Sequence, residues 1–389
     1  MTTTTVNEEH QTGPGPTSQD VEMMSLALDL AAGASMETAP NPRVGCVLVK
    51  DGQIIGRGCT QKVGQAHAEV MALRDAASQG HAVQGATAYV TLEPCSHYGR
   101  TPPCANALIE AGVARVVAAL EDPNPLVAGR GFAMLREAGI DVLSGVLAQR
   151  ASELNIGFLH RMRTGKPWVR LKMAASMDGF TALPNRQSQW ITDAAAREDG
   201  HHWRARADAI LTGIGTVLAD NPQMNIRYPE YTSRFQPRKI VVDSRLRIHG
   251  MPNRARLLES GRVLLVHAQT RDETLDVDCC ECKVEQDCEI QYLHLPNPDG
   301  THVDLSRLMQ ELGREQINEM HVEAGAQLSG ALLAAGLVDE LLLYLAPKFL
   351  GSGRTMFDLP GLQHVEQAQQ WTMSDLRQVG NAVRVILRA

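Results

Sequence analysis

The 389-residue sequence has few aromatic side chains, no long apolar segment and no excess of basic charge. Its net charge is −7 at pH 7, which argues against a general nucleic-acid binder because contacts to a phosphate backbone need a basic surface. With 4% aromatic residues and no stripe of Lys and Arg, it also lacks an aromatic RNA-binding motif. The longest apolar runs, such as 341–346, have the length of a strand and fall far short of a membrane span.

The first segment of the chain, residues 1–19, has no apolar core. It contains four consecutive threonines and a Gly-Pro-Gly-Pro run, so we expect a disordered tail and not a secretory signal. Eight cysteines follow. In a chain of this size without a signal peptide, cysteines favour reduced thiols and metal binding over disulfides. We therefore expect a cytoplasmic protein.

Hydrophobic periodicity predicts two α/β halves, which agrees with the length of the chain. We place one layered α/β domain at 20–147, a linker helix and hinge at 148–166, and a second domain at 167–389. No internal repeat is visible, so the halves are not duplicates. In the first half we expect helices at 21–31 (capped by Ser18), 66–78, 102–111 and 131–138, and strands at 44–49, 53–58, 86–92, 113–120 and 141–143. In the second half we expect helices at 194–206 and 327–335, and strands at 168–173, 209–212, 239–243, 262–267, 317–323, 340–346 and 382–387.

A spaced set of His, Glu and Cys side chains carries the most specific chemistry. His67 and Glu69 are followed by a segment in which Cys95 comes after a proline and Cys104 after two more. One imidazole and two thiolates provide three zinc ligands and leave a fourth tetrahedral position for water. Zinc lowers the pKa of bound water to about 7, and Glu69 is placed to move protons to and from that water. The set matches the signature of zinc nucleobase deaminases, although eight residues separate the cysteines here and two do so in that signature.

Both parts of this motif fall at expected helix N-termini. His67 and Glu69 would lie in the first turn of one helix, and Cys104 in the first turn of another that opens with prolines. The helix dipoles would help to keep the thiolates deprotonated. The alternative is a structural zinc site with His97 as the fourth ligand. Such a site has no use for an acid at position 69.

Three other features leave two readings open. Arg100, in the loop between the two cysteines, could bind a substrate phosphate or be solvated. Asn41, in a turn before a strand, could contact a nucleobase edge or only close the turn. The stretch 325–330 follows a strand and opens a helix, so it could offer backbone N–H groups to a phosphate. It lacks the three-glycine fingerprint, so it could equally be an ordinary turn.

Taken together, these motifs resemble the bifunctional deaminase/reductase family of riboflavin biosynthesis known as RibD (RibG in some bacteria). The resemblance covers about residues 20–389 in order. The matching stretches are 41–46, 67–69, 94–104, 121–125, 129–131, 172–179, 188–192, 216–222, 242–244, 323–325 and 338–340.

The resemblance implies a cytidine-deaminase-like α/β/α domain followed by a dihydrofolate-reductase-like domain. The first would deaminate 2,5-diamino-6-ribosylamino-4(3H)-pyrimidinone 5′-phosphate, and the second would use NADPH to reduce the ribose of the product. It implies zinc at His67, Cys95 and Cys104, with Glu69 as the proton shuttle. The implied NADPH contacts are Ala174, Trp190, Thr216, Asp220, Ser244, Gly325, Ala326, Gln327, Leu328, Ser329, Gly330 and Ala331. The implied substrate contacts are Ser188, Arg204, Met224, Arg227 and Glu323, to which we add Asn41.

The segment 276–289 departs from the family pattern, because it carries Cys279, Cys280, Cys282 and Cys288 among acidic residues. Adjacent cysteines chelate one metal poorly, so we interpret the segment as a surface loop. We expect a homodimer, in which the strand after the last helix pairs across a subunit boundary. Two further hypotheses are a deaminase of nucleosides or tRNA and a non-enzymatic scaffold with structural zinc. The acidic charge disfavours the first and Glu69 disfavours the second.

Overall fold

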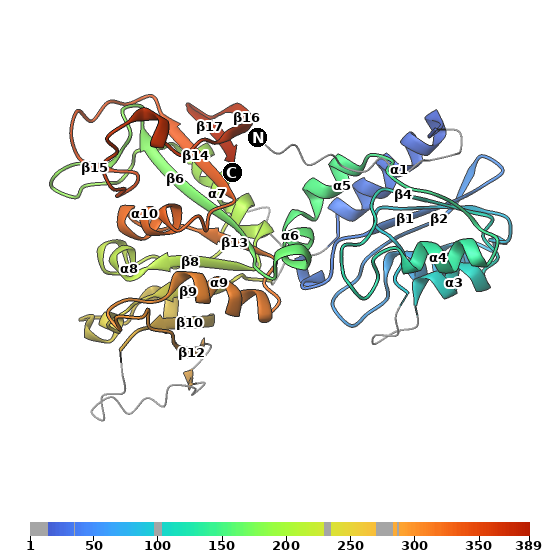
Figure 1. Ribbon diagram of the computed structural model, residues 1–389, viewed down its shortest axis with the longest axis horizontal. Helices are drawn as coiled ribbons and strands as arrows, with labels where there is room; N and C mark the ends of the chain where they lie inside the picture. The colour runs from blue at the N-terminus through green and yellow to red at the C-terminus, as the bar shows by residue number, and fades with distance from the viewer. Residues whose placement is uncertain (1–14, 35, 97–102, 229–234, 270–282, 286–287) are drawn as a thin grey trace. The chain divides into compact units, whose positions relative to one another are not determined.

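The computed structural model describes the chain except for residues 1–14, 35, 97–102, 229–234, 270–282 and 286–287. It consists of two compact units (Figure 1). One comprises Met1–Ala34 and Arg43–Asn155, and the other comprises Ser35–Pro42 and Ile156–Ala389. The predicted linker is two helices, α5 (Ala148–Leu154) in the first unit and α6 (Ile156–Thr164) in the second. In the described part of the chain, no helix is long and apolar enough to cross a membrane.

The first unit is built on a five-stranded sheet in the order β2-β1-β3-β4-β5. β1 pairs antiparallel with β2 and β3, whereas β3, β4 and β5 are parallel. A tight hairpin turn joins β1 and β2, and its residues Asp51 and Gly52 both have positive φ, as such a turn between antiparallel strands requires. The strands are β1 (Gly45–Lys50), β2 (Gln53–Cys59), β3 (Thr87–Val90), β4 (Arg115–Ala118) and β5 (Asp141–Leu143). The other helices are α1 (Ser18–Ala32), α2 (Ala68–Ser78), α3 (Cys104–Glu110) and α4 (Arg130–Glu137).

The N-terminus of α1 differs from the prediction. Thr17, not Ser18, is the N-cap, and α1 begins within the segment expected to be a tail. The Thr17 side chain accepts a hydrogen bond from the Asp20 backbone, and the Asp20 carboxylate accepts one from the Thr17 backbone. This reciprocal capping box satisfies N–H groups that a helix start otherwise leaves free. Asp20 also accepts bonds from Arg115 and Tyr89, which ties the helix to the sheet.

Two glycines of β2 fix the position of α2, the helix that carries part of the metal-ligand motif. A Cβ at Gly58 would lie 2.3 Å from the Ala68 carbonyl oxygen, and one at Gly56 would lie 2.4 Å from that of Ala72. No side chain larger than hydrogen fits at either position. The helix therefore lies directly on the strand backbone, which sets the position of its first turn.

The second unit contains a ten-stranded sheet in the order β11-β12-β10-β9-β8-β13-β6-β14-β17-β16. The run from β12 to β14 is parallel, and antiparallel strands close both ends. Its strands are β6 (Trp168–Ser176), β8 (Ala209–Gly213), β9 (Arg238–Val242), β10 (Gly261–His267), β11 (Lys283–Glu285), β12 (Cys288–His294), β13 (Glu319–Val322), β14 (Glu340–Ala346), β16 (Thr372–Val379) and β17 (Ala382–Arg388). A separate pair consists of β7 (Phe180–Ala182) and β15 (Arg354–Thr355). The helices are α7 (Ala194–Arg206), α8 (Ile214–Asp220), α9 (Leu305–Arg314) and α10 (Ala326–Ala334).

Several of these elements were not predicted. α9 has an Asp304 cap and buries Leu308, Met309 and Leu312 at helical spacing, so its sequence signal was present and overlooked. β16 is exposed along most of its length, so no burial pattern marked it. The interpretation of 276–289 as a surface loop is wrong at its end, because Cys288 is fully buried in β12. Cys279, Cys280 and Cys282 lie outside the described residues.

The structural reason for expecting a homodimer is also wrong. The strand after the last helix is β14, and it pairs with β6 on one side and with β17 on the other, both within the same chain. The strands expected at 340–346 and 382–387 are both present, and they pair antiparallel with each other.

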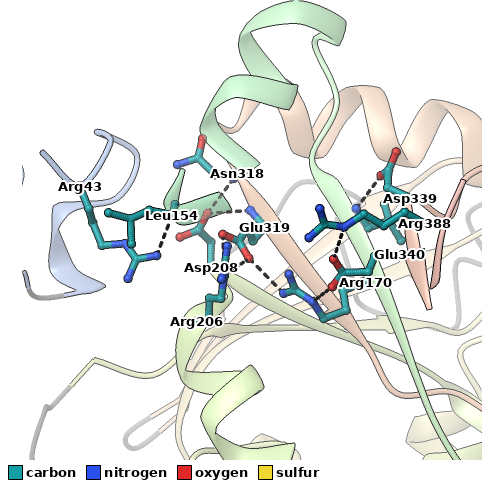
Figure 2. A network of polar contacts seen from close by, with 11 residues as sticks. Arg43, Leu154, Arg170, Arg206, Asp208, Asn318, Glu319, Asp339, Glu340 and Arg388 are labelled. Carbon is teal, nitrogen blue, oxygen red and sulfur yellow. Dashed lines mark hydrogen bonds and ion pairs between the residues drawn. The ribbon is translucent and has the colours of Figure 1, made fainter. Parts of the chain in front are cut away.

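Buried ion pairs cross one face of the second sheet (Figure 2). Arg170 of β6 is 1% exposed and pairs with Glu319 of β13 and Glu340 of β14. Arg206 of α7 also binds Glu319, and Arg388 of β17 binds Glu340. Each buried charge therefore has a partner of opposite sign, as burial of an ion requires. Strand alternation places the side chain two residues after Arg170, that of Lys172, on this same face.

Candidate functional site

In the first unit, a histidine and two cysteines converge from three separate segments. We expected His67 in the first turn of α2, but it is the N-cap residue just before that turn. Its backbone is extended and its side chain makes no capping hydrogen bond, so the ring is available to other partners. Cys104 is the first residue of α3, as predicted. Cys95 lies in the segment between β3 and α3.

The three ligand atoms lie within 4.8 Å of one another. His67 Nδ1 is 3.7 Å from the Cys95 sulfur and 3.4 Å from the Cys104 sulfur. The Cys104 backbone N–H donates to the Cys95 sulfur over 3.3 Å. Among the described residues, this is the one set of three or more His, Cys, Asp or Glu side chains that is so arranged. Two sulfurs and an imidazole nitrogen are a donor set that suits zinc.

The electrostatics favour thiolate at this cluster and a proton carrier beside it. A hydrogen bond from Cys104 lowers the pKa of Cys95 to about 4, and His67 acts in the same direction. The hydrogen bond between the two thiol groups and burial raise the pKa of Cys104. Cys104 therefore holds the proton that the two sulfurs share, and binding of a metal cation would displace it. Glu69 is 3% exposed, and burial raises its pKa to about 7. A carboxyl group with such a pKa can both accept and donate a proton near neutral pH.

Three predicted residues are not placed at this cluster. His97, the alternative fourth ligand, and Arg100 lie outside the described residues. Asn41 lies in the segment that belongs to the second unit, where its backbone N–H donates to the Thr38 carbonyl and closes a turn. A role for Asn41 in substrate binding stays a prediction.

In the second unit, Arg204 of α7 and Glu323, the residue after β13, form a bidentate pair. Arg204 Nε and Nη2 donate to the two carboxylate oxygens of Glu323 over 2.5 and 2.9 Å. Its remaining nitrogen donates to the Asn225 carbonyl over 2.9 Å. Burial alone would raise the pKa of Glu323, but the charges of Arg204 and Lys172 hold it well below its usual range. The structure thus brings together two of the predicted substrate residues.

Two residues beside this pair were missed by the sequence interpretation. Lys172 of β6 has its amine 5.8 Å from the centre of the Tyr344 ring of β14. Burial lowers the pKa of Lys172, Glu323 opposes that effect and Arg204 adds to it. His321 of β13 is completely buried, with Nε2 3.2 Å from Glu323 Oε1. The available signal was a lysine and a histidine inside two of the predicted strands.

The other predicted substrate residues of this unit differ in how exposed their side chains are. Arg227 is exposed and donates to the Asn225 side chain over 2.9 Å, and its backbone N–H reaches His201. Met224 is 3% exposed with its side chain in an apolar cluster, so it can meet a substrate only through its backbone. Ser188 is half-buried in the segment between β7 and α7.

The predicted cofactor residues follow the carboxyl edge of the parallel strands. Ala174 lies near the end of β6, where it pairs with Tyr344 of β14. Gly325 comes after β13, Ser244 comes after β9, and Thr216 lies in α8, the helix that follows β8. Ligands of open parallel sheets bind outside this edge. A Cβ built at Gly325 would meet Thr216 Oγ1 at 3.8 Å and no other group within 4 Å, so the edge is open here.

The first turn of α10 is the part of this edge that suits a phosphate. Gly325 is its N-cap in extended conformation and supplies no side-chain cap, so the backbone N–H groups of this turn are available to an anion. Not all of 325–331 can act through side chains. Ala326, Ser329 and Gly330 are buried, and a Cβ at Gly330 would lie 2.0 Å from the Asp358 carbonyl oxygen.

Trp190 and Asp220 are exposed members of the predicted cofactor set. Trp190 is 64% exposed and is not a core residue, although that is the commoner role of tryptophan. The Arg197 guanidinium lies 4.3 Å from the centre of its ring, and Lys348 donates to its carbonyl over 2.8 Å. Trp190, Arg197 and Lys348 line a pocket, together with Pro347 and Asn381.

Comparisons with known proteins agree with this division of the chain. Residues 17–120 match the family model of the cytidine and deoxycytidylate deaminase zinc-binding region, and residues 167–385 match that of the RibD C-terminal domain. The chain is 50% identical to riboflavin biosynthesis protein RibD of Escherichia coli over 376 residues, which covers 93% of this chain and 97% of that protein. It is 46% identical to RibD of Haemophilus influenzae, with 95% and 97% covered.

Two solved structures are similar over nearly the whole chain. Acinetobacter baumannii RibD superposes with a TM-score of 0.83 at 44% identity and covers 95% of this chain and 98% of its own. A Thermotoga maritima protein described as a diaminohydroxyphosphoribosylaminopyrimidine deaminase/5-amino-6-(5-phosphoribosylamino)uracil reductase gives 0.80 at 30% identity, with the same coverage.

Proposed function

The chain belongs to the RibD family of bifunctional deaminase/reductases of riboflavin biosynthesis, and on that basis we propose the reaction of each domain. Residues 20–147 deaminate 2,5-diamino-6-ribosylamino-4(3H)-pyrimidinone 5′-phosphate to 5-amino-6-(5-phosphoribosylamino)uracil. Residues 167–389 reduce the ribose of that product with NADPH to give 5-amino-6-(5-phosphoribitylamino)uracil. The observation that carries the proposal is the convergence of His67, Cys95 and Cys104 beside the buried Glu69.

In the deaminase domain, His67, Cys95 and Cys104 would hold one zinc ion, which would supply a Lewis acid for the activation of water. Glu69 takes a proton from the attacking water and returns it to the departing amine, which leaves as ammonia. The pKa of about 7 that burial gives Glu69 suits both transfers. A scaffold with structural zinc would gain nothing from a carboxyl group buried at this place.

In the reductase domain, NADPH supplies the hydride. Arg204 and Glu323 hold the sugar hydroxyl groups, with their charged donors and acceptors fixed by the bidentate pair. The ribose ring must open before reduction, so its ring oxygen needs a proton. Lys172 provides that proton, since burial lowers its pKa and makes it a better acid. Ala174, the α10 N-terminus, Thr216 and Ser244 would hold the cofactor.

Both reactions are tested by incubating the protein with the diaminopyrimidine ribosyl phosphate and following the products by mass spectrometry. Without NADPH, the expected product has exchanged one amine for oxygen. With NADPH, it has also gained two hydrogen atoms. An unchanged substrate in both incubations would contradict the deaminase assignment, and deamination without reduction in the presence of NADPH would contradict the reductase assignment.

We further propose that the protein is a cytoplasmic homodimer. The free thiols of Cys95 and Cys104 must stay reduced to bind a metal, which suits the cytoplasm. β16 is the last strand of the large sheet, and it exposes Met373 and Leu376 by 60% and 58%. An edge with exposed apolar groups favours association. Light scattering after gel filtration measures the oligomeric state, and a monomer at micromolar concentration would contradict it.

A further inference from the structure

The segment 224–228 of the second unit belongs to no helix or strand, and side chains from other segments hold its backbone. The Asn225 carbonyl accepts a hydrogen bond from Arg204 Nη1 over 2.9 Å. The Gln236 side chain accepts from the Ile226 N–H over 2.8 Å and donates to the Ile226 carbonyl over 3.2 Å. Backbone groups outside helices and sheets need such partners. Side chains, and not a ladder of backbone hydrogen bonds, therefore set the course of this segment.

His201 of α7 supplies a further contact of this kind. Its Nδ1 accepts the backbone N–H of Arg227 over 3.4 Å. Among the described residues, this is the one hydrogen bond of that N–H group. His201 lies one helical turn before Arg204, so the two side chains leave α7 on the same face. The helix therefore holds the segment at two points, the carbonyl of Asn225 and the N–H of Arg227.

His201 can accept this bond because its ring is neutral. Burial lowers the pKa of His201 to about 4, and the charges of Arg204 and Arg227 act in the same direction. Glu323 opposes the shift, and Lys172 adds a smaller contribution to it. At neutral pH the Nδ1 lone pair is therefore free to accept, whereas a protonated ring would have only donors. With Nδ1 as the acceptor, the ring proton lies on Nε2.

We propose that His201 is a positioning residue of the reductase, which fixes the backbone of Arg227 and thereby directs its guanidinium toward the substrate. The inference rests on the proposed function, in which Arg227 is a substrate contact. The Arg227 side chain is exposed and donates to the Asn225 amide oxygen, and it pairs with no carboxylate among the described residues. Its charge is thus available to an anionic group of the substrate. Misplacement of a substrate contact by about 1 Å can cost on the order of 10² in rate.

Two replacements of similar shape test which ring nitrogen is needed. The amide oxygen of His201→Asn can take the place of Nδ1, whereas that of His201→Gln lies near the place of Nε2. With pre-deaminated substrate and saturating NADPH, His201→Asn should keep the substrate KM within about twofold, because the hydrogen bond is retained. His201→Gln should raise the substrate KM about threefold to tenfold, the effect of one lost hydrogen bond, with kcat and the KM for NADPH unchanged. Equal KM values in the two variants, or the reverse order, would overturn the inference.

Glu198→Gln, at an exposed position of the same helix, is the control for a general effect on α7. A double-mutant cycle with Arg227→Ala separates positioning from direct contact. If His201 acts only through Arg227, His201→Gln should cause no further rise in KM when Arg227→Ala is already present. A further rise of the same size would show that His201 acts on the substrate by itself, contrary to the proposal.

If these variants are unstable, the 15N signals of the unmodified protein decide instead. At pH 7 the His201 ring should carry its proton on Nε2, and a proton on Nδ1 would refute the role as acceptor. Failure of the reductase proposal is distinguishable from failure of this inference. In the first case the unmodified protein would not oxidise NADPH with the pre-deaminated substrate. In the second case it would do so, and His201→Gln would do so with an unchanged KM.

Discussion

Arg204 binds both carboxylate oxygens of Glu323, so a helix on one face of the large sheet is fixed to the end of its central strand β13. The pair is 12% and 18% exposed, which keeps part of it open to a ligand. A bidentate guanidinium fixes the plane of the carboxylate as well as its charge. The orientation of Glu323 toward a sugar therefore depends on Arg204.

Replacement of Arg204 tests that dependence. Arg204→Lys keeps the charge but cannot bind both oxygens, and we expect it to lower reductase kcat/KM by roughly tenfold to a hundredfold, because each charged hydrogen bond contributes about 1.5–3 kcal/mol. Reduction of pre-deaminated substrate, followed by NADPH absorbance, is the measurement. Glu198→Gln, at an exposed position of the same helix, is the control for a general effect on α7. An unchanged kcat/KM in Arg204→Lys would show that the second hydrogen bond is not needed.

Glu69→Gln separates metal binding from proton transfer. The amide has nearly the same shape, so zinc should stay bound at His67, Cys95 and Cys104. It cannot carry a proton, and loss of a positioned general acid–base group costs on the order of 10²–10⁴ in rate. Zinc content by atomic absorption and ammonia release are measured on the same sample. Normal ammonia release by this variant would refute the assigned role.

Cys104→Ser should remove the metal and the deaminase activity together, since a hydroxyl is a poor replacement for one of two thiolates. The reductase should keep its rate on pre-deaminated substrate, because the sulfur lies in the other compact unit. Chelator treatment of the unmodified protein should give the same split. Cys46→Ser is the control, a buried cysteine outside the cluster. If Cys104→Ser lost both activities, the two domains would not be independent.

The sequence predicted the zinc cluster well and the reductase site less well, for a physical reason. His67, Cys95 and Cys104 carry chemistry that few other roles require, and His67 and Cys104 lie at helix starts that the spacing and the prolines indicate. Lys172, in contrast, comes close to Glu323 only because β6 pairs with β13. No local pattern records that pairing. β16 was missed for the same reason, because it is held by pairing with β17 and not by burial of its own side chains.

Arg170→Ala tests the buried ion pairs. Removal of the guanidinium leaves Glu319 and Glu340 with less compensation, and breaking a buried pair destabilises by about 3–5 kcal/mol. All four tryptophans lie in the second unit, at 168, 190, 203 and 371, so tryptophan fluorescence follows the unfolding of that unit in urea. Arg314→Ala removes a more exposed pair with Glu311 and should cost less than about 1 kcal/mol. Similar losses in the two variants would mean that burial adds nothing to the Arg170 contacts.

Lys172→Met tests the proton donor of the reductase. Methionine fills a similar volume without a charge, so we expect reduction to fall by about 10²–10⁴ while deamination is unchanged. Burial lowers the pKa of Lys172, so in the unmodified protein the reductase rate should fall as pH rises, and at a lower pH than an ordinary lysine would give. The variant should lack this alkaline decline in its residual rate. Lys50→Met, in the first unit, is the control, since its amine reaches only the Ala82 carbonyl at the surface. A variant that reduced its substrate at the normal rate, or that kept the same alkaline decline, would require another acid for opening the ribose ring.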